Sequence, residues 1–137
     1  MKTAMLLFLC ILMLQVKTAS AADPSICNPE ADITFHKNGT LQSCDLRNVY
    51  EQGDLKCNAY SKISFFSNGK LRSCVLYEDF KAGAFICGDL ATIQFYPSGN
   101  LNSCTLTKPA VVGGKSCMQG QPLFLYENGA LKSCTEQ

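Results

Sequence analysis

The sequence predicts an all-β protein, an open array of four 30-residue antiparallel β-hairpin repeats stapled by disulfides. The first observation is a fixed period, since the same turn glycine recurs as Gly39, Gly69, Gly99 and Gly129. The second is that every copy carries two cysteines at constant positions, and the third is a short β-rich run before each glycine. A fixed period near this length is typical of repeat architectures, in which stacked units bury one another's apolar faces.

Residues 1–21 are predicted to be a signal peptide. Lys2 gives a positive start, residues 5–14 are apolar, and Ala19-Ser20-Ala21 has the small side chains of a cleavage site. The apolar stretch is too short to span a bilayer and no later stretch reaches that length, so no membrane span is expected. Residues 22–137 are then a single β-repeat domain, secreted or periplasmic. Its units cover about 27–46, 57–76, 87–106 and 117–137.

Charge and cysteine content narrow the range of partners. Loss of Lys2 and Lys17 with the leader leaves ten basic against eleven acidic side chains, a net charge of −1. No block of like charge is present, so neither nucleic acid nor an anionic membrane is an expected partner. Cleavage also removes Cys10 and leaves eight cysteines, which an oxidising compartment would pair into disulfides. Disulfides would stabilise a β-repeat chain of this size, whose hydrophobic core is expected to be small.

Each repeat begins with a β-rich run, such as Ile63-Ser64-Phe65-Phe66, and continues into a turn signal such as Asn68-Gly69. A two-residue type I′ turn would place Asn38 and Gly39 at the tip of the first hairpin. A three-residue loop over residues 37–39 would put Gly39 in the left-handed conformation. The second is preferred, because Pro97 suits the first position of a type I turn and Ser98 would be strained at positive φ.

The three-residue loop sets an expected register in which Phe35 faces Leu41 and Ile33 faces Ser43. This side is nearly constant among the copies and is predicted to be buried, whereas positions 34, 36, 40 and 42 are predicted to be wet. Constant Ser43 and Cys44 are adjacent, so a bulge or a change of packing partner is expected there. The linking segment from Asn48 to Cys57 is interpreted as a third, poorer strand.

Two disulfide schemes respect the repeat. Pairing across 17 residues closes each unit on itself and is preferred, because the array starts just before one cysteine and stops just after another. Its pairs are Cys27–Cys44, Cys57–Cys74, Cys87–Cys104 and Cys117–Cys134. Pairing across 13 residues would join Cys44 to Cys57 if the linking segment turned between Asn48 and Gly53. Sequence alone leaves this choice open.

The hairpin core resembles the MORN-variant repeat, a family of bacterial Asn-Gly hairpin repeats that includes antitoxin-like members. The resemblance lies in residues 65–73, Phe-Phe-Ser-Asn-Gly-Lys-Leu-Arg-Ser, and in residues 126–133, Tyr-Glu-Asn-Gly-Ala-Leu-Lys-Ser. It covers about 14 of the 30 residues in each copy, and the cysteines, long linkers and leader depart from the family's pattern. It implies an extended or rolled sheet of hairpins with a scaffold or interaction role and no catalytic residues.

No catalytic constellation is apparent in the sequence, so the protein is not expected to be an enzyme. The one histidine, His36, occupies a slot that is aromatic in the other copies. A single imidazole gives no plausible zinc site, and cysteines in an oxidising compartment are expected to pair rather than to bind metal. The Ser43 series lacks matching bases and indicates packing or hydrogen bonding. No catalytic residue, metal or cofactor is therefore predicted.

The possible binding face is a column of side chains on the wet side of the hairpins: His36, Phe66, Tyr96 and Tyr126. If the copies stack in register, these rings could bind a sugar or an apolar partner. The first hypothesis is a non-enzymatic binding or structural scaffold for an unknown protein or glycan, and the second is a carbohydrate-binding module. A third is an inhibitor or toxin-like effector presenting the tip at residues 37–40. Asn38 begins an Asn-Gly-Thr sequon, which is usable only in a eukaryotic host.

Overall fold

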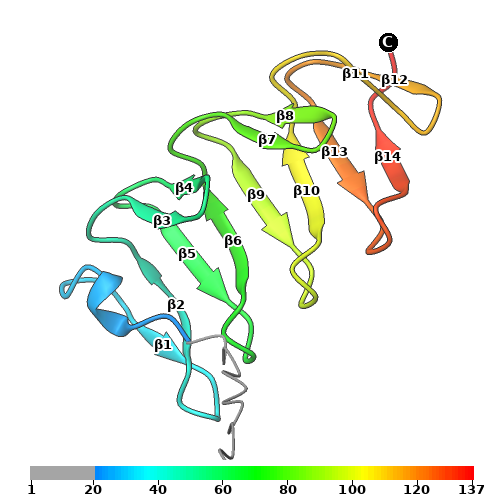
Figure 1. Cartoon of the computed structure of the whole chain (residues 1–137). Coiled ribbons are helices and arrows are strands. Elements are labelled where there is room, and N and C mark those ends of the chain that lie inside the picture. Colours follow the sequence, from blue (N-terminus) through cyan, green and yellow to red (C-terminus); the bar gives the residue numbers. More distant parts are fainter. Residues whose placement is uncertain (1–20) are drawn as a thin grey trace, which may run out of the picture.

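The protein is an all-β array of hairpins. Its structure, a computed structural model, describes residues 21–137, so the predicted leader lies, apart from residue 21, outside the described part. There the chain forms fourteen strands and one short 3₁₀-helix, η1 (Pro24–Ile26). Four long hairpins follow one another along the chain, their tips pointing to one side and smaller hairpins at the opposite end (Figure 1).

The long hairpins form one eight-stranded antiparallel sheet in the order β1-β2-β5-β6-β9-β10-β13-β14. Since β1 and β14 are its two edges, the sheet is open. The strands are β1 (Thr34–Phe35), β2 (Leu41–Asp45), β5 (Lys62–Phe65), β6 (Leu71–Val75), β9 (Thr92–Phe95), β10 (Leu101–Thr105), β13 (Pro122–Leu125) and β14 (Leu131–Cys134). The small hairpins are β3 (Tyr50–Gln52) with β4 (Leu55–Cys57), β7 (Phe80–Ala82) with β8 (Phe85–Cys87), and β11 (Ala110–Val112) with β12 (Lys115–Cys117).

Each long hairpin turns through a three-residue loop, as the sequence predicts. In the first copy the His36 N–H donates to the Thr40 carbonyl at 2.9 Å, and the Gly39 N–H donates to the His36 carbonyl at 2.9 Å. Gly39 has φ +84°, and the three equivalent glycines also have positive φ. Glycine is needed here because an L side chain is strained in this conformation.

A bulge just beyond the tip corrects the predicted register. Phe35 faces Leu41 as expected, but Ser43 pairs with Thr34 instead of Ile33, because Gln42 is an extra residue between two paired positions. The same shift occurs in the other three hairpins. The extra residue moves Ser43 off the buried side. The bulge is at Gln42, one residue before the Ser43-Cys44 pair where the sequence predicts a bulge or a change of packing partner.

The register defines two faces of the sheet. The inner face is that of Ile63, Phe65, Leu71 and Cys74, which are all buried. Along it, each second cysteine pairs across strands with the branched residue that starts the next hairpin, as Cys44 does with Ile63 and Cys74 with Ile93. The opposite side is the outer face, and it carries the constant serines.

Phe35 departs from the prediction that all four equivalents are buried. Its side chain is 50% exposed, whereas Phe65 is 1% exposed. The small hairpin β3–β4 brings Tyr50 against Phe65, with ring centroids 6.0 Å apart in an edge-to-face arrangement. Phe35 lies on the edge strand and is preceded by η1 rather than by a small hairpin. The first copy therefore leaves part of its inner face open.

The linking segments form complete two-stranded hairpins, which corrects the interpretation of a single third strand. Tyr50 pairs with Cys57 and Gln52 with Leu55, so the turn lies at Gly53 and Asp54. Gly53 has φ +60°, and its equivalents Gly83 and Gly113 have φ +62° and +58°. Positive φ at the first turn position is the requirement of the primed turns that close tight hairpins, which explains the second repeated glycine.

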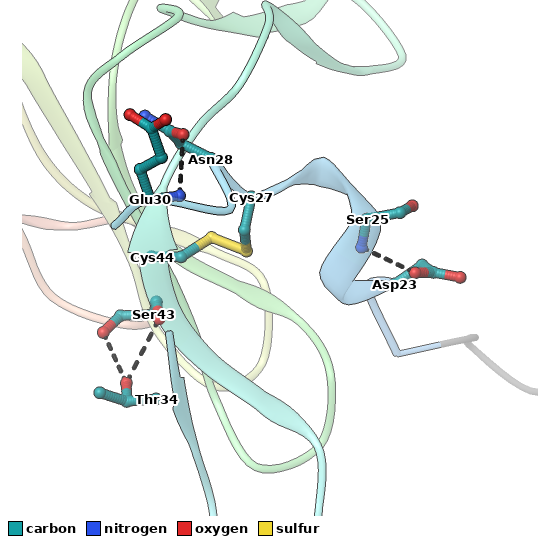
Figure 2. The surroundings of a disulfide bond; sticks show 8 residues. All are labelled: Asp23, Ser25, Cys27, Asn28, Glu30, Thr34, Ser43 and Cys44. Carbon is teal, nitrogen blue, oxygen red and sulfur yellow. Dashed lines mark hydrogen bonds between the residues drawn. A yellow bond between two sulfur atoms is a disulfide. The ribbon is translucent and has the colours of Figure 1, made fainter. Parts of the chain in front are cut away.

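Four disulfides link each small hairpin, or η1 in the first copy, to the long hairpin that follows it. The pairs are those of the 17-residue scheme: Cys27–Cys44, Cys57–Cys74, Cys87–Cys104 and Cys117–Cys134. Their Cα atoms lie 5.5–5.7 Å apart. Figure 2 shows the first bond with the neighbouring Thr34–Ser43 pair on the sheet. In the chain-entropy model, closing a loop of this size contributes on the order of 3 kcal/mol.

Candidate ligand-binding face

A row of mostly small polar side chains crosses the whole sheet on the outer face. Each member is the paired partner of the next, from β1 to β14: Thr34, Ser43, Ser64, Ser73, Gln94, Ser103, Phe124 and Ser133. Within the first two hairpins the facing hydroxyls bond to each other, Thr34 Oγ1 to Ser43 Oγ at 2.8 Å and Ser64 Oγ to Ser73 Oγ at 2.7 Å. The constant serines thus serve cross-strand hydrogen bonding.

The predicted aromatic column lies on the tip side of this row. His36, Phe66 and Tyr96 are half-buried, and Tyr126 is 52% exposed. The column is not a free surface along its whole length, because each side chain has a definite contact. Two members bond to the next repeat, and the other two lie under a cation.

His36 and Tyr96 connect neighbouring repeats. His36 Nε2 lies 2.9 Å from the Phe65 carbonyl oxygen, and the Tyr96 hydroxyl donates to the Leu125 carbonyl at 2.8 Å. A carbonyl oxygen only accepts, so the proton of this His36 bond is on Nε2. In both cases the bonded carbonyl is 29 residues further along the chain. These two side chains therefore add hydrogen bonds between hairpins that the strand pairing β2–β5 and β10–β13 already joins.

Phe66 and Tyr126 are each paired with a basic side chain from the bulge position of the same hairpin. Arg72 Cζ lies 5.7 Å from the Phe66 ring centroid, and Lys132 Nζ lies 5.9 Å from that of Tyr126. Contacts of this length are cation–π interactions, worth about 0.5–1 kcal/mol at an exposed site. The bulge matters for this arrangement, because it brings Ser73 to the outer face beside Arg72, whereas the predicted register places Ser73 on the inner face.

A groove of about 410 Å³ lies on the outer face between the second and third hairpins. Seven of its lining residues come from the aromatic column, the outer row and the bulge positions: Ser64, Phe66, Arg72, Ser73, Gln94, Tyr96 and Asn102. Phe95 of strand β9 and Pro97 of the tip complete the lining. Two column members, Phe66 and Tyr96, belong to this lining. The groove therefore has aromatic rings, amides, hydroxyls and one cation within reach of a ligand.

The tip asparagines add a second set of contacts between repeats. The Asn38 side-chain amide donates to the Ser67 carbonyl at 2.8 Å, and Asn68 does the same to the Pro97 carbonyl at 3.0 Å. In the third copy, where Ser98 replaces asparagine, Asn100 donates to the Glu127 carbonyl at 2.9 Å. Asn38 is exposed as the sequon requires, but its amide nitrogen is already used in the array.

A second groove, which the sequence does not predict, opens on the inner side between β3–β4 and β7–β8. It has a volume of about 540 Å³ and an apolar floor, and Asp54, Lys70 and Lys81 are at its rim. The apolar residues are Leu55, Leu71, Phe80 and Phe95. The repeated Gly53 was the signal for it in the sequence, because a small hairpin on each side is what makes the groove.

Among residues 21–137, three ionisable groups have pKa values displaced by local structure. Glu78, whose carboxylate lies 2.9 Å from Lys56 Nζ, raises the pKa of Lys56. Burial raises the pKa of Tyr50, which packs on Phe65. The backbone and side-chain hydrogen bonds from Ser25 lower the pKa of Asp23, which caps η1. None of these groups lines the outer groove.

Over residues 21–137 there is no group of three or more His, Cys, Asp or Glu side chains placed to hold a metal ion. All eight cysteines of this part are in disulfides. Within the same part no helix has the length and apolarity to cross a membrane. Four intramolecular disulfides indicate an oxidising, non-cytoplasmic compartment.

No protein-family profile, no curated protein and no solved structure matches this chain.

Proposed function

We propose that the protein is an exported, non-enzymatic binding scaffold that presents the outer face of its sheet to a ligand. The observation that carries this proposal is the outer groove between Phe66 and Tyr96. Its side chains vary from copy to copy where the inner face stays nearly constant, as in the series Gln42, Arg72, Asn102 and Lys132. Variation on a constant scaffold is typical of repeat proteins whose binding surfaces differ from unit to unit.

Export is supported by the disulfides and by the predicted signal peptide at residues 1–21. The resemblance of the hairpin core to MORN-variant repeats supports a scaffold role rather than catalysis. The hairpin tips are a weaker candidate for a binding site, because Asn38 and Thr40 already bond to each other and to Ser67. An inhibitor that acts through residues 37–40 would need these side chains to be free.

A carbohydrate-binding module is the second candidate, and the groove chemistry favours it over a purely structural protein. Sugar rings combine apolar faces, which stack on aromatic side chains, with hydroxyls, which amides and hydroxyls can bond. Phe66 and Tyr96 provide the rings, and Gln94 and Asn102 provide the amides. The hydrogen bond from Tyr96 to the Leu125 carbonyl holds its ring in place before any ligand arrives, which lowers the entropic cost of binding.

The test is binding of the mature chain, with its disulfides intact, to a glycan array and to a panel of secreted proteins. Replacing Arg72 and Asn102 together by alanine should abolish binding of any ligand found. The matched control replaces Arg47 and Asn48, an exposed Arg and Asn in a linking segment, and should leave binding unchanged. Tyr96→Ala with Tyr126→Ala should abolish binding if the ligand is a glycan. Equal loss in the control, or no loss in the groove variant, would place the ligand elsewhere.

A further inference from the structure

We propose that the outer groove takes an acidic oligosaccharide, one with a carboxylate-bearing sugar, which runs across the strands of the sheet. This inference rests on the proposed binding function of the outer face and specifies its ligand. It is argued from the charge of the groove, the hydrogen-bonding capacity of its walls and the spacing of the repeats.

The outer groove carries one positive charge, that of Arg72, and no negative charge among its lining residues. Within residues 21–137 the ion pairs are Lys56–Glu78 and Lys115–Glu136, so Arg72 has no carboxylate partner in that part of the chain. Its guanidinium lies over Phe66, which leaves its N–H groups available to a ligand. Arginine binds a carboxylate through two parallel hydrogen bonds, which makes a carboxylate the complementary group.

The remaining walls suit the neutral part of a sugar. Gln94 and Asn102 present amides, each able to donate and to accept. Ser64 and Ser73 satisfy each other by one hydrogen bond and keep further acceptor capacity toward the groove. Tyr96 presents its ring, because its hydroxyl is bonded to Leu125. This mixture disfavours a purely apolar ligand and gives a sugar hydroxyl several partners.

The repeat spacing matches a polymer with a two-sugar period. Each repeat adds two strands to the sheet, and strands lie about 4.8 Å apart, so equivalent positions in adjacent repeats are separated by about 10 Å at the outer row. This is close to the length of an extended disaccharide. Beyond Asn102 of the third hairpin, the fourth hairpin offers Lys132 over Tyr126 as a second cationic position. Arg72 and Lys132 are two repeats apart, about 20 Å at the outer row, so an extended oligosaccharide of six sugars with a carboxylate on each is long enough to contact both.

The test is calorimetric titration of the mature, oxidised protein with oligogalacturonate of six sugars, a neutral cello-oligosaccharide of the same length and a sulfated oligosaccharide. The acidic oligomer should bind at least about tenfold more tightly than the neutral one, and this preference should weaken as ionic strength rises. Arg72→Gln should remove the preference, and Arg72→Lys should keep it at lower affinity. Arg47→Gln is the control and should change nothing.

The outcomes separate this inference from the function on which it rests. Equal affinity for the neutral oligomer, or an unchanged preference in Arg72→Gln, would overturn the acidic ligand and leave outer-face glycan binding standing. Binding of the sulfated oligomer alone would overturn the carboxylate assignment. Absence of binding to all three, together with a protein ligand sensitive to Arg72→Ala with Asn102→Ala, would overturn the inference and retain the scaffold. Thermal unfolding should show that each variant is folded at the temperature of the titration, because loss of the Arg72–Phe66 contact costs at most about 1 kcal/mol.

Discussion

The phenol of Tyr96 donates a 2.8 Å hydrogen bond to the Leu125 carbonyl, which joins the third repeat to the fourth. Tyr126 occupies the equivalent position one repeat later, in the hairpin whose strand β14 is the last of the sheet within residues 21–137. The two tyrosines therefore share a position in the repeat and differ in whether their hydroxyl connects two units. This difference allows the contribution of one inter-repeat bond to be measured.

Tyr96→Phe should lower the free energy of unfolding by roughly 0.5–1.5 kcal/mol, the usual net value of one hydrogen bond. Tyr126→Phe removes the same atom without breaking an inter-repeat bond and should cost close to nothing. Urea unfolding followed by tyrosine fluorescence measures both. If the two variants are equally stable, the Tyr96 hydroxyl does not stabilise the array.

The second prediction concerns Leu90, which has φ +56° and a 70% exposed side chain. The fourth repeat has Gly120 at the equivalent position, with φ +73°. Leu90→Gly should raise the free energy of unfolding by roughly 0.5–1 kcal/mol, because relief of left-handed strain outweighs the extra chain entropy of glycine. Leu90→Ala is the matched control and should bring no such gain, since alanine keeps the Cβ atom. A destabilised glycine variant would show that the exposed leucine has a contact that offsets the strain.

The long hairpins are largely predictable from the sequence because their determinants are local. Pro97 and Ser98 restrict the backbone of the third loop to the three-residue type. Because the four copies share one period, the same loop is predicted for all of them. The bulge shifts the register by one residue, so it moves Ser43 to the outer face without changing the pattern of β-forming residues. In the sequence, two adjacent constant residues, Ser43 and Cys44, indicate this shift.

The small hairpins and the inner groove were harder to predict. Residues 50–57 read Tyr-Glu-Gln-Gly-Asp-Leu-Lys-Cys, a segment with few β-branched residues, and its strands are short. They are maintained by the primed turn at Gly53, by the disulfide at Cys57 and by Tyr50 packing on Phe65. Two of these three contributions come from outside the segment. The inner groove depends on two such hairpins and is therefore a property of the assembled array.

Alkaline pH should destabilise the fold through Tyr50 and Lys56. The pKa of Tyr50 is raised by burial and that of Lys56 by Glu78, so the folded state holds both protons more tightly than the unfolded state does. The stability that they contribute is complete below their ordinary values of about 10 and is lost as pH rises through the raised folded values. Urea unfolding at pH values on either side of 10 should show this decline. The decline with pH should be shallower in Tyr50→Phe than in the unmodified protein. Equal slopes in these two proteins would contradict a contribution from Tyr50.

The last prediction compares two equivalent positions, Leu76 and Glu136, each of which bridges to the first cysteine of its own unit. Leu76 is 1% exposed and its backbone bonds to Leu90 and Ala91 of the following repeat, whereas Glu136 in the last repeat of residues 21–137 is exposed and pairs with Lys115. Leu76→Ala should cost about 2–5 kcal/mol, because it removes buried methyl groups and leaves a cavity. Glu136→Ala should cost at most about 1 kcal/mol, the usual range for an exposed ion pair. Chemical unfolding of the oxidised variants measures both values. If both variants lose the same free energy of unfolding, Glu136 stabilises the fold by more than an exposed ion pair does.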